Sequence, residues 1–260
     1  WAKEAGRFRE TGDYFYFVGC LPYFDVTFRY LNLSPLDTAR NVLLLLNTMG
    51  VEPVISNEER CCGHDAFWSG NEAVFLELAR QNLEMIKASG AKTVIFSCPE
   101  GYVTFRDEYP KHLGELPFEV IHITEFLARK LPASEISFQP STNGAITYQD
   151  PCRLGRKAGI YEAPRELLKQ IPGTRLTEMA RNRENALCCG TSAWMECSGC
   201  SKTMQSERLE EAAQTGATTL ITACPKCQIH LTCAQSNTDS ELKVTDIYAY
   251  LSHSLRGSAL

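Results

Sequence analysis

Long apolar runs are missing from this sequence of 260 residues. The longest, Val42 to Leu46, is far short of the roughly 20 residues that cross a bilayer, so the sequence predicts no membrane span of its own. The residues after Trp1 are polar, which argues against a secretory signal peptide. Because the first residue is not Met, we expect a processed or excerpted chain. The expected location is the cytoplasm.

Three common functional signatures are also absent. No G-x-G-x-x-G motif marks a flavin or nicotinamide nucleotide site, and no C-x2-C-x2-C-x3-C run marks a ferredoxin. The net charge is -5 at pH 7, with acidic and basic residues interleaved, so no basic stripe is available to follow phosphates. Nucleic acid is therefore not an expected partner.

Cysteine is what the sequence does contain, with twelve residues. A chain of this length forms a core without disulfide staples, and the density is below that of small stapled secreted domains. Two pairs, Cys61–Cys62 and Cys188–Cys189, are adjacent in sequence. Clustered thiols in a chain of this kind more often bind metal or carry out redox chemistry.

The chain also contains an internal repeat. Four segments recur in the same order: 14–20 with 145–152, 61–68 with 188–195, 94–101 with 220–227, and 120–131 with 243–255. Such self-similarity indicates two copies of one unit. We predict two domains, 1–135 and 136–260, joined by a proline-containing linker at 131–144. Trp68 and Trp194 lie at nearly the same place after the repeated Cys-Cys-Gly sequences and are expected to pack over them.

Strands and helices alternate in both halves. The predicted strands are 14–18, 51–55, 93–97, 118–121, 146–149 and 219–222, and the predicted helices are 36–49, 71–88, 124–131, 163–171, 202–215 and 246–255. Alternation of this kind predicts an α/β fold with a small parallel sheet, flanked by helices, in each half.

Five cysteines of the second half have a spacing typical of a metal site. Cys152 is followed by Cys188–Cys189–Gly190 and then by Cys224-Pro-Lys-Cys227. Cys-x-x-Cys brings two thiolates within reach of one metal centre. The anchoring cysteines follow predicted strands, at the sheet edge where ligands bind in α/β folds. The Pro and Gly residues suit tight turns that direct backbone N–H groups toward the sulfurs.

The number of thiols narrows the choice of metal. Structural zinc and a cubane [4Fe–4S] cluster each take four protein ligands, whereas five thiols are present here. Either one thiol is spare or the cluster is not a simple cube. We predict at least one iron–sulfur cluster, and zinc, a thiol redox pair and disulfides remain open as alternatives.

The Cys…CCG…CPxC pattern resembles the cysteine-rich CCG domain found in the B-type and D-type subunits of heterodisulfide reductase. Related chains include iron–sulfur subunits of glycolate, lactate and glycerol-3-phosphate oxidation systems, thiol:fumarate reductase, and a subunit of a sulfite-reduction membrane complex. The resemblance covers nearly the whole chain, as two copies. It implies that Cys152, Cys188, Cys189, Cys224 and Cys227 hold a noncubane [4Fe–4S] cluster that binds substrate sulfur at an open iron. It also makes Cys188 and Cys189 candidate catalytic residues.

The first copy departs from this pattern. Cys20, Cys61, Cys62 and Cys98 match, but the fifth position is Gly101. Four thiols could hold a cubane or modified cluster, with Glu100 or His64 as an unusual ligand. The alternatives are an emptied site kept for its shape, or four free buried thiols. A chain with one intact copy resembles the family members with a single active cluster.

Charged residues and histidines near the motifs have two interpretations. His64 follows the first CCG and is a weak candidate for a catalytic proton donor; the alternative is a hydrogen-bond partner behind the ligands. His230 is close to the second CPxC motif. Arg153, Arg156 and Lys157 either neutralise cluster charge and hold an anionic substrate, or form a solvated helix start.

The remaining thiols carry weaker signals. Cys197 and Cys200 form a further C-x-x-C, interpreted either as an extra redox pair or second metal site, or as small buried residues at the start of a helix. Cys233 is expected to be a core thiol.

The expected function is an oxidoreductase that exchanges electrons with a disulfide or dithiol, either a small molecule or a protein, in anaerobic metabolism. An electron-relay subunit of a flavin-dependent dehydrogenase or membrane redox complex is the alternative, and a zinc or thiol-rich scaffold is a third. A single cluster needs a donor, so the expected partners are a ferredoxin-like or flavoprotein subunit and a membrane cytochrome subunit. Such partners would associate the chain with a membrane.

Overall fold

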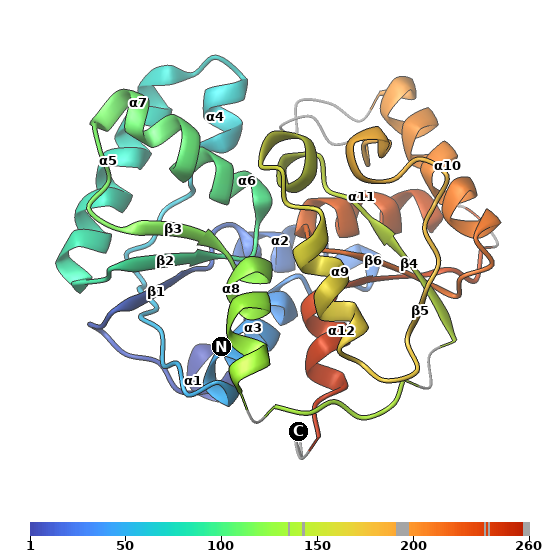
Figure 1. Ribbon diagram of the computed structural model, residues 1–260. Helices are drawn as coiled ribbons and strands as arrows, with labels where there is room; N and C mark the ends of the chain where they lie inside the picture. Colours follow the sequence, from blue (N-terminus) through green and yellow to red (C-terminus); the bar gives the residue numbers. More distant parts are fainter. Residues whose placement is uncertain (135, 142–143, 191–197, 237, 239, 257–260) are drawn as a thin grey trace.

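Two small parallel sheets lie side by side, with helices between and around them (Figure 1). This computed structural model describes residues 1–134, 136–141, 144–190, 198–236, 238 and 240–256. The first sheet has the order β1-β2-β3 and the second β5-β4-β6-β7, and every neighbouring pair is parallel. The strands are β1 Tyr14–Phe17, β2 Thr93–Phe96, β3 Glu119–His122, β4 Ala145–Gln149, β5 Arg175–Leu176, β6 Thr219–Thr222 and β7 Lys243–Asp246.

The expected strand at 51–55 does not form. Only Val54 makes a bridge there: its N–H donates to Tyr14 O at 2.7 Å, and its carbonyl accepts from Tyr16 N–H at 2.9 Å. The neighbouring residues face the other way, toward Arg9: Arg9 N–H donates to the Pro53 carbonyl at 3.0 Å, so the segment makes single bridges on both sides and no ladder. The segment still covers the β1 edge of the first sheet, the position that β5 has in the second.

All six expected helices form within a few residues of their expected bounds, and within the described residues six more α-helices form where none was expected. The longest of the first half, α5, begins after Asn71, whose side chain accepts from Val74 N–H, and ends at Gly90 in the left-handed conformation. The helices are α1 Ala2–Ala5, α2 Leu21–Thr27, α3 Leu36–Thr48, α4 His64–Trp68, α5 Glu72–Ser89, α6 Pro99–Val103, α7 Tyr109–Leu113, α8 Ile123–Lys130, α9 Glu162–Lys169, α10 Gly199–Gln214, α11 Pro225–Gln235 and α12 Ile247–His253.

The two halves share one apolar core. The main cluster of buried side chains includes Phe15 and Phe96 of the first half and Tyr148 and Leu251 of the second. Helix α3 packs against α12, and α8 against α9, so each half supplies helices to the junction (Figure 1). The expected α/β fold with two pseudo-repeated domains is confirmed. None of the helices in the described part of the chain combines the length and apolar character that crossing a bilayer requires.

Candidate metal centre

Four of the predicted ligands lie just beyond the carboxyl ends of central strands. Cys98 follows β2 and Cys224 follows β6, and each is the N-cap of a helix that begins with Pro. Cys20 lies three residues after β1 and Cys152 three residues after β4. Because parallel strands end at the same sheet edge, each repeat gathers its cysteines there.

The five thiols of the second repeat form an unbroken chain of contacts. Hydrogen bonds link Cys152 to Cys188, Cys188 to Cys189, Cys189 to Cys227, and Cys227 to Cys224. Residues far apart in sequence therefore meet at one place, as their spacing predicted. No disulfide joins any of the cysteines that the structure describes.

The thiols of the second repeat differ in burial. Cys189, Cys224 and Cys227 are buried in a small apolar cluster with Leu209, Leu220 and neighbours. Cys152 and Cys188 are only partly buried. Hydrogen bonds from Cys152 and Cys189 lower the pKa of the Cys188 thiol, which favours its thiolate form.

The CCG turn has the same construction in both repeats. Gly63 and Gly190 have φ values of 82° and 78°, a region that favours glycine. A Cβ on Gly190 would lie 2.7 Å from Ser201 O, so a larger residue has no room. The turn directs the glycine N–H toward the first cysteine of the pair: Gly63 N–H donates to Cys61 Sγ at 3.5 Å, and Gly190 N–H donates to Cys188.

A buried polar layer lies behind the second-repeat site. The Arg165 guanidinium donates to both oxygens of Asp150, each at 2.8 Å, with side-chain exposures of 1% and 2%. Asp150 is two residues before Cys152, so this bidentate pair fixes the loop that carries the sulfur. The buried Arg208 donates to Gln149, the last residue of β4, and to Glu211 at 2.8 Å.

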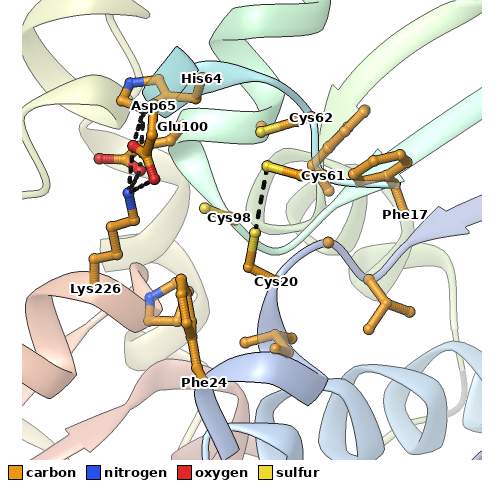
Figure 2. Close-up of a pocket in the computed structure, with 16 residues that line it drawn as sticks. Phe17, Cys20, Phe24, Cys61, Cys62, His64, Asp65, Cys98, Glu100 and Lys226 are labelled. Atoms are coloured by element: carbon orange, nitrogen blue, oxygen red, sulfur yellow. Dashed lines mark hydrogen bonds and ion pairs between the residues drawn. The ribbon is translucent and has the colours of Figure 1, made fainter. Parts of the chain in front are cut away.

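The first-repeat thiols are less closely connected. Cys20 Sγ–H donates to Cys61 Sγ at 3.7 Å, and Cys61 also contacts Cys62 (Figure 2). These hydrogen bonds lower the pKa of Cys61 to about 3. Burial, and next the charge of Cys224 from the other repeat, raise the pKa of Cys98. Cys98 is thus outside the chain of thiol contacts and close to the second-repeat site.

Aromatic rings replace the polar layer in the first repeat. The sheet register makes Phe17 equivalent to Gln149 and Phe96 equivalent to Thr222. A Cβ added to Gly101 would lie 3.2 Å from the Phe96 ring. A side chain at the fifth-ligand position would therefore require the Phe96 ring to shift. The pocket here, about 430 Å³ including its open part, is lined by the thiols together with apolar side chains such as Phe24.

A compact charged group separates the two thiol sites. Lys226 Nζ lies 2.7 and 2.8 Å from the Asp65 oxygens and 2.6 Å from Glu100 Oε2. His64 Nδ1 lies 2.9 Å from Asp65 Oδ1 and 3.3 Å from Glu100 Oε2. Figure 2 shows the imidazole on the side of Lys226, with the sulfurs on the other side. His64 and Glu100 also line the pocket of the first-repeat thiols, so either of them as a replacement ligand stays a prediction.

The basic residues after Cys152 have separate surroundings. The Arg153 guanidinium lies over the Trp68 ring, 4.1 Å from its centroid, at the rim of the pocket lined by Cys152 and Cys189. Trp68 is 42% exposed, so it borders the first CCG turn rather than covering it. Arg156 donates to the Ala186 carbonyl, and Lys157 lies 3.8 Å from Asp107 and Glu108. Trp194 lies outside the described residues.

The other sequence candidates are peripheral. Cys200 is exposed on the first turn of α10, so the expectation of a small buried residue was wrong for it, and Cys197 lies outside the described residues. Cys233 is only partly buried and accepts from Lys202 at 3.6 Å. His230 is buried and hydrogen-bonds Gln205 at 2.9 Å; burial lowers its pKa to about 4.

Sequence reasoning missed four charged residues near the thiols: Lys226, Asp65, Asp150 and Arg165. Lys226 lies inside the CPxC motif, where only the cysteines carried a signal, and Asp65 follows His64 in the first CCG segment. Asp150, directly before Pro151-Cys152, could have been flagged as a strand-end carboxylate, but its partner Arg165 is too distant in sequence to infer.

The donor set of the second repeat fits a polynuclear thiolate-bound cluster. Five sulfurs share one site, and three of them lie in an apolar shell. The fold and site together define a two-repeat cysteine-rich protein of redox type.

Comparison with known proteins places this class in a family. The model of the CCG cysteine-rich domain matches residues 14–106 and again 146–232, so the chain belongs to the CCG cysteine-rich domain family. It is 35% identical over 98% of its length to the D-type subunit of dihydromethanophenazine:CoB–CoM heterodisulfide reductase from Methanosarcina barkeri. It is 31% identical over 99% of its length to the probable iron-sulfur-binding oxidoreductase FadF of Bacillus subtilis. EtfAB:quinone oxidoreductase of Syntrophomonas wolfei is 30% identical over 87% of the chain.

By name, these relatives are oxidoreductases or subunits of oxidoreductase complexes. The chain spans 62% of the Methanosarcina protein, 36% of the Bacillus protein and 34% of the Syntrophomonas protein. Among solved structures, glutamate racemase RacE1 of Bacillus anthracis covers 94% of the chain, and the chain covers 79% of it, at 11% identity. The TM-score is 0.39.

Proposed function

We propose that the chain is an iron–sulfur subunit of heterodisulfide-reductase type, with one noncubane [4Fe–4S] cluster held by Cys152, Cys188, Cys189, Cys224 and Cys227. Its reaction is the exchange of electrons with a disulfide or dithiol. The observation that carries the proposal is the unbroken chain of five thiol contacts at the end of β4 and β6. Five thiols exceed the ligand number of zinc or a cubane cluster.

The shape of the site supports access for a sulfur substrate. Cys152, Cys189, Cys224 and Cys227 line a pocket, and Cys152 and Cys188 are the two partly buried thiols of the site. Arg153 lies at the rim of this pocket, where its charge would favour an anionic thiol compound. When bound, the cluster supplies electrons one at a time and an iron that takes sulfur. The chain's own residues exclude water behind it and orient the substrate in front of it.

Cys188 and Cys189 are the proposed catalytic pair, because the lowered pKa of Cys188 favours its thiolate and Cys189 connects it to the buried thiols. His64 is the weaker candidate, for proton transfer: its Nδ1 lies 2.9 Å from Asp65, and its buried Nε2 has no hydrogen-bond partner among the described residues. In this proposal the electrons come from a ferredoxin-like or flavoprotein partner, and a membrane cytochrome is a further partner.

Metal content and spectroscopy test the proposal. The chain purified without oxygen should be brown and contain roughly four irons and four sulfides. Addition of a thiol compound should change the EPR signal of the oxidised cluster, because substrate sulfur binds at iron. One zinc per chain, or no metal in chain prepared without oxygen and supplied with iron and sulfide, would contradict it.

The electron-relay function is the second candidate. One of the relatives is named a quinone oxidoreductase, and the first-repeat site lacks the fifth thiol that a two-cluster reaction on one disulfide would use. A relay would show the same iron content but an EPR signal that thiol compounds leave unchanged.

A further inference from the structure

The charged group between the two thiol sites joins the repeats through one lysine. Lys226 comes from the second repeat, whereas both of its carboxylate partners, Asp65 and Glu100, come from the first. The lysine side chain is only 4% exposed, and the three contacts are between 2.6 and 2.8 Å. We refer to Lys226, Asp65 and Glu100 as the lysine clasp (Figure 2).

The clasp connects equivalent motifs of the two repeats. Lys226 lies between Cys224 and Cys227 on the first turn of α11, and Glu100 has the same place between Cys98 and Gly101 on α6. The two Cys-Pro-x segments therefore meet at their third residues, Lys226 and Glu100, which carry opposite charges. This contact exists because the repeats differ in sequence at that position.

The position of Lys226 is unfavourable without its partners. A cation near the N-terminus of a helix opposes the helix dipole, and a buried ammonium loses its hydration. Burial lowers the pKa of Lys226, but Glu100 and Asp65 raise it above its usual value, so the charge is kept. Buried ion pairs of this kind add little net stability compared with apolar residues of the same size. Stability alone is thus a weak explanation for the clasp.

We propose that Lys226 is a positioning residue through which the first repeat holds the second-repeat ligand loop and sets the charge beside its cluster. The inference depends on the proposed function, because it concerns the cluster assigned to Cys152–Cys227. It gives the first repeat a role that needs no metal of its own: its Asp65 and Glu100 carboxylates anchor the ammonium between two ligands of the neighbouring site.

The proposal predicts opposite effects of the two partners. A reduced cluster carries one more negative charge, so loss of the Lys226 ammonium should make reduction harder. Loss of the Asp65 or Glu100 charge should make it easier. A purely structural role would not give shifts of opposite sign.

The test is an anaerobic redox titration of the full iron-loaded chain, followed by EPR. Lys226→Met should lower the ratio of reduced to oxidised cluster at a fixed potential by about tenfold, which for one electron is about 59 mV. Asp65→Asn and Glu100→Gln should each shift the ratio the other way. Lys226→Arg, which keeps the charge, should stay near the parent value. The control is Lys243→Met, since Lys243 is exposed on β7 and should leave the potential unchanged.

The outcomes separate this inference from the proposed function. If the parent chain binds no iron, the proposed function fails first. If iron is bound and Lys226→Met and Asp65→Asn move the potential in the same direction or not at all, the clasp has no such role. Should Lys226→Met fail to fold, Asp65→Asn, Glu100→Gln and Lys226→Arg decide the question, and unchanged potentials in the two carboxylate variants overturn the proposal.

Discussion

The two repeats share a fold and a set of cysteines but differ in what lies behind the sulfurs. In the second repeat, Gln149 ends the strand and Asp150 follows it, and both are bound by buried guanidinium groups. In the first repeat, Phe17 and Phe96 have the places of Gln149 and Thr222, and their rings lie 5.1 Å apart. One site is charged and closely connected, and the other is apolar and open.

The difference shows that four matching cysteines do not make two sites equivalent. Aromatic rings stand in the first repeat where the second has a buried polar layer. A side chain at Gly101 would also require the Phe96 ring to shift by a few tenths of an ångström. The first repeat contributes instead through contacts with its neighbour.

The largest expected effect comes from breaking the complete site. Cys227→Ser removes the thiol that links Cys189 to Cys224. We expect the iron content to fall from roughly four per chain to near zero, because the remaining thiols no longer enclose the cluster. Iron and sulfide analysis after anaerobic purification measures this.

The matched control for this variant is Cys233→Ser, which changes a partly buried thiol outside the chain of contacts on the same helix. It should keep its iron. Equal loss in both variants would show that Cys227 has no special place in the site.

The second prediction tries to complete the first site. Phe96→Thr combined with Gly101→Cys restores both the space and the fifth thiol, following the second repeat. We expect the iron content to rise toward roughly eight per chain. Gly101→Cys alone should give no gain, because its Cβ would lie 3.2 Å from the Phe96 ring. Eight irons in the parent chain would show that the four thiols of the first repeat already hold a second cluster.

The third prediction concerns the polar layer. Arg165→Met leaves the buried Asp150 carboxylate without its bidentate partner, and loss of one member of a buried pair costs about 3–5 kcal/mol of unfolding free energy. Denaturant unfolding measures it. Arg129→Met is the control, since its contact with Glu119 is exposed and such pairs contribute about 0–1 kcal/mol. Similar losses in both variants would argue against an essential polar layer.

The last effect, small over any single pH unit, is a pH dependence in the first repeat. Burial lowers the pKa of His122 to about 3, and its Nδ1 accepts from Thr124 N–H at the start of α8. Between about pH 6.5 and pH 3 the unfolded state binds the proton and the native state does not. Stability is therefore full above about pH 6.5 and falls by about 1.4 kcal/mol for each pH unit below it.

His122→Gln removes this titration while keeping a side chain that can accept the same hydrogen bond. Unfolding free energies measured from pH 6 to pH 4 should have a shallower slope in the variant. Identical slopes would show that the His122 side chain is not the group responsible.

Much of the architecture was predictable because its signals are local. Asn71 and Gly90 mark the ends of α5, and the alternation of strands and helices indicated a parallel sheet in each half. The prediction failed at 51–55, where β-branched residues suggested a strand but only single bridges form at Val54. Strand β7 and helix α11 were missed; their sequences do not show a clean period of two or of 3.6. The division into domains at 135/136 stays a prediction.

The site was predictable only as far as its sulfurs. Cysteine spacing and strand ends indicated that Cys152, Cys188 and Cys224 converge. The charges around them depend on contacts between distant segments, such as Arg165 with Asp150, or between the repeats, such as Lys226 with Asp65. No pattern within either segment reports such a contact, so only the folded chain reveals them.

The partial exposure of Cys152 and Cys188 has a consequence for handling and for survival in air. An opening that admits a disulfide also admits dioxygen, which is far smaller. Oxidative damage should begin at these two sulfurs, because thiolates in reach of solvent oxidise first. The lifetime of the brown colour in air would then measure how well a neighbouring protein shields that entrance.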